Sequence, residues 1–206
     1  IYRRLQRSIG IKVVMNFDYL IIGAGSAGCV LSNRLSEDQN NKVAVFEAGG
    51  SSDIWKVKMP LALLYTMHDP KYNWKYYSEP EPHLNNRRLF CPRGKMIGGC
   101  SAHNGMVFVR GNRNDYERWE NFGLKSWSYE KILPYFKKIE KWSEGENQYR
   151  GSFGLLPVNQ SKNDNPLFSS FLEAASEAGH KINPDMNGEY QEGFGMFDTT
   201  IHKGER

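Results

Sequence analysis

The sequence predicts an α/β fold that begins with a Rossmann-type sheet of parallel strands. Phe17 and residues 19–22 form a short apolar run that stops at a glycine, which favours a strand buried on both faces over a helix. Gly23, Gly25 and Gly28 follow with G-x-G-x-x-G spacing and lead into a helical pattern over residues 27–35. A second apolar run, residues 43–46, predicts a second buried strand and ends at Glu47. These features together indicate a βαβ unit.

The glycine spacing indicates what the turn after the first strand does. Gly23 permits a tight turn, Gly25 lets a pyrophosphate approach the backbone, and Gly28 lets the helix lie close to the strand. The free amides and the dipole of the helix N-terminus then favour a phosphate. The spacing therefore predicts a dinucleotide site rather than an ordinary glycine turn.

Glu47 completes this pattern. It lies about twenty residues beyond the last glycine, where a carboxylate can accept hydrogen bonds from a ribose diol. A ribose carrying a 2′-phosphate is disfavoured there, because like charges would meet. The residues predict an adenine dinucleotide, and the glycine motif alone leaves NAD and FAD both open.

Composition and charge separate the first residues from the remainder. The 206 residues are 39% hydrophobic and 24% charged, as in a soluble globular protein, with a net charge of +4. Residues 1–16 hold four basic residues and no acid, so 4 − 4 leaves no net charge for residues 17–206. Nucleic acid binding therefore has no support. Ile1, Leu5 and Ile9 recur between arginines, which predicts a mitochondrial transit peptide. The alternative is a start at Met15 and a cytoplasmic protein.

A second informative stretch, also with paired glycines, runs from Pro92 to Trp119. Gly98 and Gly99 precede Cys100 and two further small residues, so the backbone there can lie against a flat ligand with its amides exposed. An ordinary tight turn is the alternative.

Two helices are predicted further along the chain. Ser128 can cap a first turn and Pro134 suits the first position of a helix. Residues 165–179 predict another helix, with one apolar face.

The two glycine stretches together resemble the glucose–methanol–choline (GMC) oxidoreductases, which depend on FAD. The likeness covers residues 17–206 and includes FDYLIIGAGSAGCVLSNRLSE, EAGG, PRGK, IGG-C-S-x-x-N-G-M, VRGNRNDYERW and WSYEKILPYFKKIE. It implies a FAD-binding domain of Rossmann type, incomplete here, with the start of a GMC substrate-binding domain. The expected divisions are a basic leader at 1–16, the FAD-binding part at 17–160 and the start of the substrate-binding region at 161–206.

The resemblance also implies residue roles. Gly23, Gly25, Ser26, Ala27 and Gly28 match the pyrophosphate loop, and Glu47 matches the acid on the adenosine ribose. Positions that touch the flavin end of FAD are matched by Cys100, Asn104, Gly105 and Val107. Many members have Gly-Gly-Ser-Ser where this chain has Gly99-Cys100-Ser101, and that change keeps a small side chain.

His103 raises a separate question, because some members of the family bond the flavin 8α carbon through a histidine before this asparagine. Most of the dehydrogenase branch instead carries an aliphatic residue there and holds FAD without a covalent link. The alternative for His103 is a histidine that hydrogen-bonds near the ring system or packs beneath it.

The function implied by the resemblance is oxidation of an alcohol to an aldehyde with hydride transfer to flavin N5. The run from Tyr72 to Arg206 is most similar to the branch that acts on choline, which implies choline as substrate and betaine aldehyde as product. A membrane quinone is the expected acceptor, with peripheral membrane association. The family's catalytic histidine lies in a C-terminal part that residues 1–206 do not contain, so we assign no catalytic residue and no metal here. Another primary alcohol, or a FAD-binding fragment without turnover, is the alternative.

Overall fold

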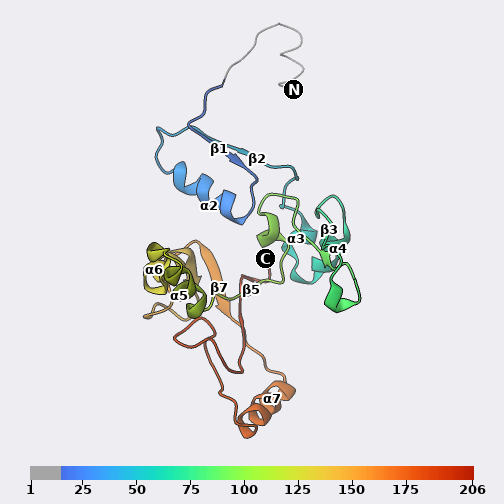
Figure 1. Cartoon of the computed structure of the whole chain (residues 1–206), viewed down its shortest axis with the longest axis vertical. Coiled ribbons are helices and arrows are strands. Elements are labelled where there is room, and N and C mark those ends of the chain that lie inside the picture. The colour runs from blue at the N-terminus through green and yellow to red at the C-terminus, as the bar shows by residue number, and fades with distance from the viewer. Residues whose placement is uncertain (1–14) are drawn as a thin grey trace. The chain divides into compact units, whose positions relative to one another are not determined.

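The computed structural model describes residues 15–206, and the predicted leader lies almost wholly outside them. The described chain forms two compact units (Figure 1), one from residues 15–54 and 64–103 and the other from residues 55–63 and 104–206. No helix within residues 15–206 is long and apolar enough to cross a bilayer. The boundary expected near residue 160 stays a prediction.

The first unit contains the predicted βαβ unit. Strand β1 (Tyr19–Ile22) pairs in parallel with β2 (Val43–Phe46), and helix α2 (Ser26–Leu35) joins them and packs against both (Figure 1). The rest of the unit holds α4 (Leu63–His68), the short pair β3 (Tyr76–Tyr77) and β4 (Phe90–Cys91), and the 3-10 turns η2 (Pro82–Leu84) and η3 (Gly99–Ala102).

The prediction that the first strands are buried on both faces is wrong for the described chain. Ile21 faces α2 and is 9% exposed, whereas Ile22 beside it is 81% exposed and Leu20 is 61% exposed. Successive side chains on a strand point to opposite faces, and α2 covers only one face of this two-stranded sheet. The other face therefore carries uncovered apolar side chains.

The second unit is built on a four-stranded sheet of order β5-β8-β7-β6. The strands are β5 (Val107–Phe108), β6 (Glu140–Trp142), β7 (Leu156–Gln160) and β8 (Asp198–Thr199). Only β6 and β7 are parallel; β8 runs antiparallel to both of its neighbours. The helices and 3-10 turns are α3 (Trp55–Lys58), η1 (Pro60–Ala62), α5 (Arg113–Asn121), η4 (Lys125–Trp127), α6 (Tyr129–Ile139) and α7 (Pro166–Glu177).

Of the two helices predicted in this unit, one is confirmed and the start predicted for the other is wrong. The helix α7 is confirmed: the side chain of Asn165 accepts a hydrogen bond from the Leu167 amide, and Gly179 follows the helix with φ of +85°. The start predicted for α6 is wrong, because the helix begins at Tyr129 and Pro134 lies inside it. Pro134 is the sixth residue of the helix and lacks the amide that would donate to Glu130 O, yet the helix continues through it to Ile139.

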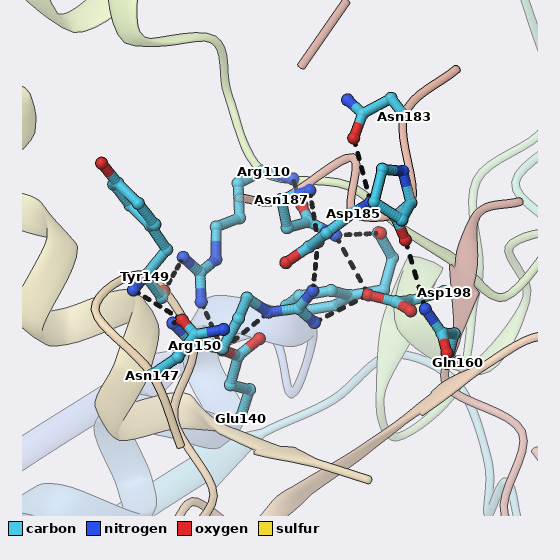
Figure 2. A network of polar contacts seen from close by, with 12 residues as sticks. Arg110, Glu140, Asn147, Tyr149, Arg150, Gln160, Asn183, Asp185, Asn187 and Asp198 are labelled. Carbon is cyan, nitrogen blue, oxygen red and sulfur yellow. Dashed lines mark hydrogen bonds and ion pairs between the residues drawn. The ribbon is translucent and has the colours of Figure 1, made fainter. Parts of the chain in front are cut away.

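A buried network of charges holds the second unit together (Figure 2). Oε1 of Glu140 accepts hydrogen bonds from Arg110 Nη2 at 2.5 Å, Arg150 Nε at 3.2 Å and the Gly151 amide at 2.7 Å. Glu140 and Arg150 are both 0% exposed. The guanidinium of Arg150 also donates to Asp185 at 2.6 Å and to Asp198 at 2.7 Å. The buried guanidinium of Arg150 therefore joins Glu140 on β6, Asp198 on β8 and the loop that carries Asp185.

The pKa values of the two arginines in the network are shifted in opposite directions. Burial lowers the pKa of Arg110, against the nearby charge of Glu140. Burial also acts to lower the pKa of Arg150, but the hydrogen bond that it donates to Asp198 and the charges of three carboxylates outweigh this effect, so that pKa is raised. Both guanidinium groups stay charged at neutral pH.

Candidate cofactor-binding site

The loop between β1 and α2 has the geometry that its glycines predict. Gly23 adopts φ of +95°, and its amide donates to Phe46 O at 2.7 Å, which ties the turn to β2. A Cβ on Gly28 would lie 2.0 Å from Gly23 O, so no side chain fits between helix and turn. The tight turn and the close helix contact are confirmed, and the binding of a phosphate at this loop stays a prediction.

Gly25 immediately precedes α2, and unlike Gly23 and Gly28 it has neither a positive φ nor a close neighbour. Its φ is −77°, and nothing described lies within 4 Å of the place a Cβ would occupy. The first turn of α2 has no acidic residue and no side-chain cap, and Ser26 and Ala27 are exposed. The backbone just before this ten-residue helix thus borders open space, and the free amides of a helix N-terminus favour a phosphate.

Glu47 lies at the position predicted to bind ribose, and it also stabilises the loop between β1 and α2 through hydrogen bonds. Its Oε2 accepts from the Ala24 amide and its Oε1 from the Gly49 amide, each at 2.8 Å. Each carboxylate oxygen has two lone pairs, so both can accept a further bond from a hydroxyl group. The sequence pattern predicted only the contact to ribose, and the bond to Ala24, 23 residues away, adds a structural role.

The second glycine stretch lies directly against the first. The Gly98 amide donates to Ala24 O at 2.7 Å, and a Cβ on Gly99 would lie 2.8 Å from Gly25 Cα. Gly98 and Gly99 both have positive φ, and η3 packs against α2. On this stretch Cys100 is exposed, whereas His103 is 4% exposed. The stretch is therefore more than an isolated turn, because it fixes the loop before α2.

In the first unit, the backbone after β2 also lies directly against the backbone before η3. A Cβ on Gly49 would lie 2.0 Å from Lys95 O, and the Ile97 amide donates to Gly50 O at 3.0 Å. Sequence reasoning did not identify these contacts, although the paired glycines after Glu47 were the available signal. Loops after β1, after β2 and before η3 meet here without intervening side chains. A dinucleotide fits such a cradle because main-chain amides can reach its phosphates.

Three predicted residues belong to the second unit. Asn104 and Gly105 are exposed and form a turn that leads to Val107 on β5, which is 51% exposed. The Asn104 Oδ1 accepts from the Met106 amide at 2.9 Å, and Met106 adopts φ of +64°. An asparagine side-chain oxygen commonly stabilises such a turn by accepting a hydrogen bond from the backbone amide two residues later.

A cleft of about 550 Å³ also lies in the second unit, and none of the predicted site residues lines it. Its walls include Arg113, Tyr129, Lys181, Glu189 and Tyr190. The glycine loops remain the site for which fold, spacing and open backbone agree.

Comparison with known proteins identifies the family. Residues 17–206 match the family model of the GMC oxidoreductases. The chain is 51% identical over 192 residues to the oxygen-dependent choline dehydrogenase of Sinorhizobium fredii, covering 93% of this chain and 35% of that protein. It is 46% identical to the mitochondrial choline dehydrogenase of Mus musculus, covering 92% of this chain and 33% of that protein. The chain thus spans about a third of the length of these relatives.

Solved structures agree in fold. Pyridoxine 4-oxidase from Mesorbium loti matches with a TM-score of 0.87 at 30% identity, over 93% of this chain and 38% of the other. A FAD-dependent oxidoreductase from Chaetomium thermophilum matches with a TM-score of 0.79 at 29% identity, over 91% of this chain and 34% of the other. The N-terminal domain of this family binds FAD, so the predictions of FAD over NAD and of a Rossmann-type FAD-binding fold are confirmed.

The sequence motifs, the cradle of glycine loops and the match across residues 17–206 lead to one conclusion: the chain belongs to the GMC oxidoreductase family and forms an N-terminal, FAD-binding part of it.

Proposed function

We propose that the protein containing this chain oxidises choline to betaine aldehyde. The observation that carries the proposal is an identity of 46–51% to choline dehydrogenases across 92–93% of the chain. When bound, FAD supplies a hydride acceptor at flavin N5 for the C–H bond of an alcohol. The residues of this chain bind and orient that cofactor.

Within this proposal the residues have separate roles. The first amides of α2 hold the pyrophosphate, and Glu47 accepts from the adenosine ribose hydroxyls while it braces the loop. The pyrophosphate loop consists of Gly23, Gly25, Ser26, Ala27 and Gly28, and the flavin end is contacted by Cys100, His103, Asn104, Gly105 and Val107. A covalent link from His103 to the flavin 8α carbon is part of the proposal to be tested.

The substrate is tested with the full-length protein under anaerobic conditions. Choline is expected to bleach the flavin absorbance, whereas ethanol and pyridoxine at equal concentration are expected to bleach it far more slowly. Pyridoxine is included because a structural neighbour is a pyridoxine 4-oxidase. Bleaching by ethanol or pyridoxine but not by choline would assign the protein to another alcohol. Turnover of residues 1–206 alone with an artificial acceptor would contradict the expectation that this part is inactive by itself.

For the acceptor we propose a quinone, with the protein associated peripherally with a membrane. The bacterial relatives are named oxygen-dependent, which makes oxygen the competing acceptor. Reoxidation of the reduced protein by a soluble quinone and by oxygen, followed side by side, decides between them. Faster reoxidation by oxygen at equal concentration would overturn the quinone proposal.

For location we propose the mitochondrion, supported by the basic residues 1–16 and by a mitochondrial relative in Mus musculus. A reporter fused to residues 1–16 is expected to enter mitochondria. A reporter that stays in the cytoplasm would favour the alternative in which Met15 begins the protein.

A further inference from the structure

The side chain of Arg206 lies against the turn that carries Asn104. Its Nη1 donates to Asn104 O at 2.6 Å and to Asn104 Oδ1 at 3.2 Å. Its Nε donates to Val57 O at 3.1 Å, and its own amide donates to Lys58 O at 2.9 Å. The guanidinium thus joins the end of α3 to the turn before β5.

This guanidinium is paired with neutral oxygens. Burial lowers the pKa of Arg206, and among residues 15–206 no carboxylate forms an ion pair with it. An arginine keeps its charge in such surroundings, so a partly desolvated cation stands directly behind the Asn104 amide. A charge in this position strengthens the hydrogen bonds that the amide makes on its other side.

The contacts also fix which way the Asn104 side chain is turned. Oδ1 accepts from two donors, the Met106 amide at 2.9 Å and Arg206 Nη1 at 3.2 Å. An Nδ2 group in that place would set donor against donor. The Nδ2 group is therefore on the other side of the amide, and no described residue accepts a hydrogen bond from it.

We propose that Arg206 is a positioning residue that holds Asn104 so that its Nδ2 donates to an acceptor atom on the flavin ring. This rests on the proposed function, in which Asn104 contacts the flavin end of FAD. Reduction adds electron density to the ring, and a donor backed by a cation stabilises that density more strongly than it stabilises the oxidised ring. The pair is therefore expected to raise the flavin reduction potential.

The test measures the reduction potential of bound flavin in the full-length protein against a reference dye, which requires no substrate. Arg206→Ala is expected to lower the potential and to weaken FAD binding roughly tenfold, the effect of losing a hydrogen bond to a charged group. Arg206→Lys keeps the charge but cannot reach Asn104 and Val57 together, so an intermediate potential is expected. Arg118→Ala, which removes an arginine 63% exposed on α5, is the matched control and should leave the potential unchanged.

A second variant keeps the proposal testable if Arg206→Ala fails to fold. Asn104→Asp retains an oxygen for Arg206 and for the Met106 amide but removes the Nδ2 donors, so it is expected to lower the potential. An unchanged or higher potential in Asn104→Asp overturns the donor assignment, and an unchanged potential in folded Arg206→Ala overturns the positioning role. A wild-type protein without a flavin spectrum would instead contradict the proposed function itself.

Discussion

Substitutions at two glycines near the first loop are expected to have different effects: one should lower the stability of the protein, and the other should weaken the binding of FAD. A Cβ on Gly28 would lie 2.0 Å from Gly23 O, and real contacts of this kind are essentially never under 3.0 Å, so Gly28→Ala must move helix or turn by about 1 Å. Overpacking of this kind costs about 1–3 kcal/mol. Gly28→Ala is therefore expected to lower the free energy of unfolding even in the apoprotein.

Gly25→Ala is expected to behave differently. Open space surrounds its Cβ position and its φ is −77°, so alanine fits. Alanine is a poorer residue than glycine before a helix by about 0.5 kcal/mol, but it also reduces the entropy of the unfolded chain by a similar amount. The stability of the apoprotein should stay within about 0.5 kcal/mol of wild type. A bound phosphate would meet the added methyl group, and losing one charge-assisted hydrogen bond weakens FAD binding about 10- to 150-fold.

The assays are urea denaturation of the apoprotein and calorimetric titration with FAD, both on the full-length protein. Asn33→Ala, on an exposed position of α2, is the control for both measurements. If Gly25→Ala bound FAD within about twofold of wild type, no phosphate would approach this backbone and the assignment of the loop would be refuted. Equal destabilisation by Gly25→Ala and Gly28→Ala would refute the reasoning from open space.

Three further outcomes are expected. Glu140→Ala leaves two buried arginines without their shared acceptor and should lower the free energy of unfolding by about 3–5 kcal/mol in urea, whereas Arg113→Ala, at an exposed ion pair, should cost about 1 kcal/mol or less; equal effects would contradict the buried network. If His103 is bonded to flavin, yellow colour stays with acid-precipitated wild type and is released from His103→Ala, and complete release from wild type rules the link out. Asn165→Ala should cost about 1 kcal/mol through the lost helix cap, measured against Asp164→Ala, and the absence of a difference would contradict the cap.

The first unit could be predicted from sequence because its structure is encoded locally. The strand, the glycine turn and α2 follow one another within residues 19–35, and each carries its own pattern. What local patterns could not indicate is which strand face stays uncovered. Ile21 and Ile22 are the same residue type and differ from 9% to 81% in exposure, because only the side toward α2 is packed.

The second unit was largely beyond sequence reasoning. Its sheet consists of short strands of two to five residues, and β5 pairs with β8 across about ninety residues of chain. The charge network joins Arg110 to Glu140, 30 residues apart, and Arg150 to Asp198, 48 residues apart. Charged residues ordinarily indicate a solvated surface, so nothing in the pattern marked these side chains as buried.

The glycines show how structure adds to a motif that sequence already identified. The G-x-G-x-x-G spacing predicts a separate role for each of its three glycines, and within the described chain only Gly23 and Gly28 are required by the fold, one by a positive φ and the other by close contact. Gly25 and Gly105 have neither property within the described chain, where nothing lies within 4 Å of their Cβ positions. Glycine at a position where the fold itself would accept alanine points to a partner that the fold does not contain. On this argument the site is defined best by the glycines that the protein does not need for its own folding.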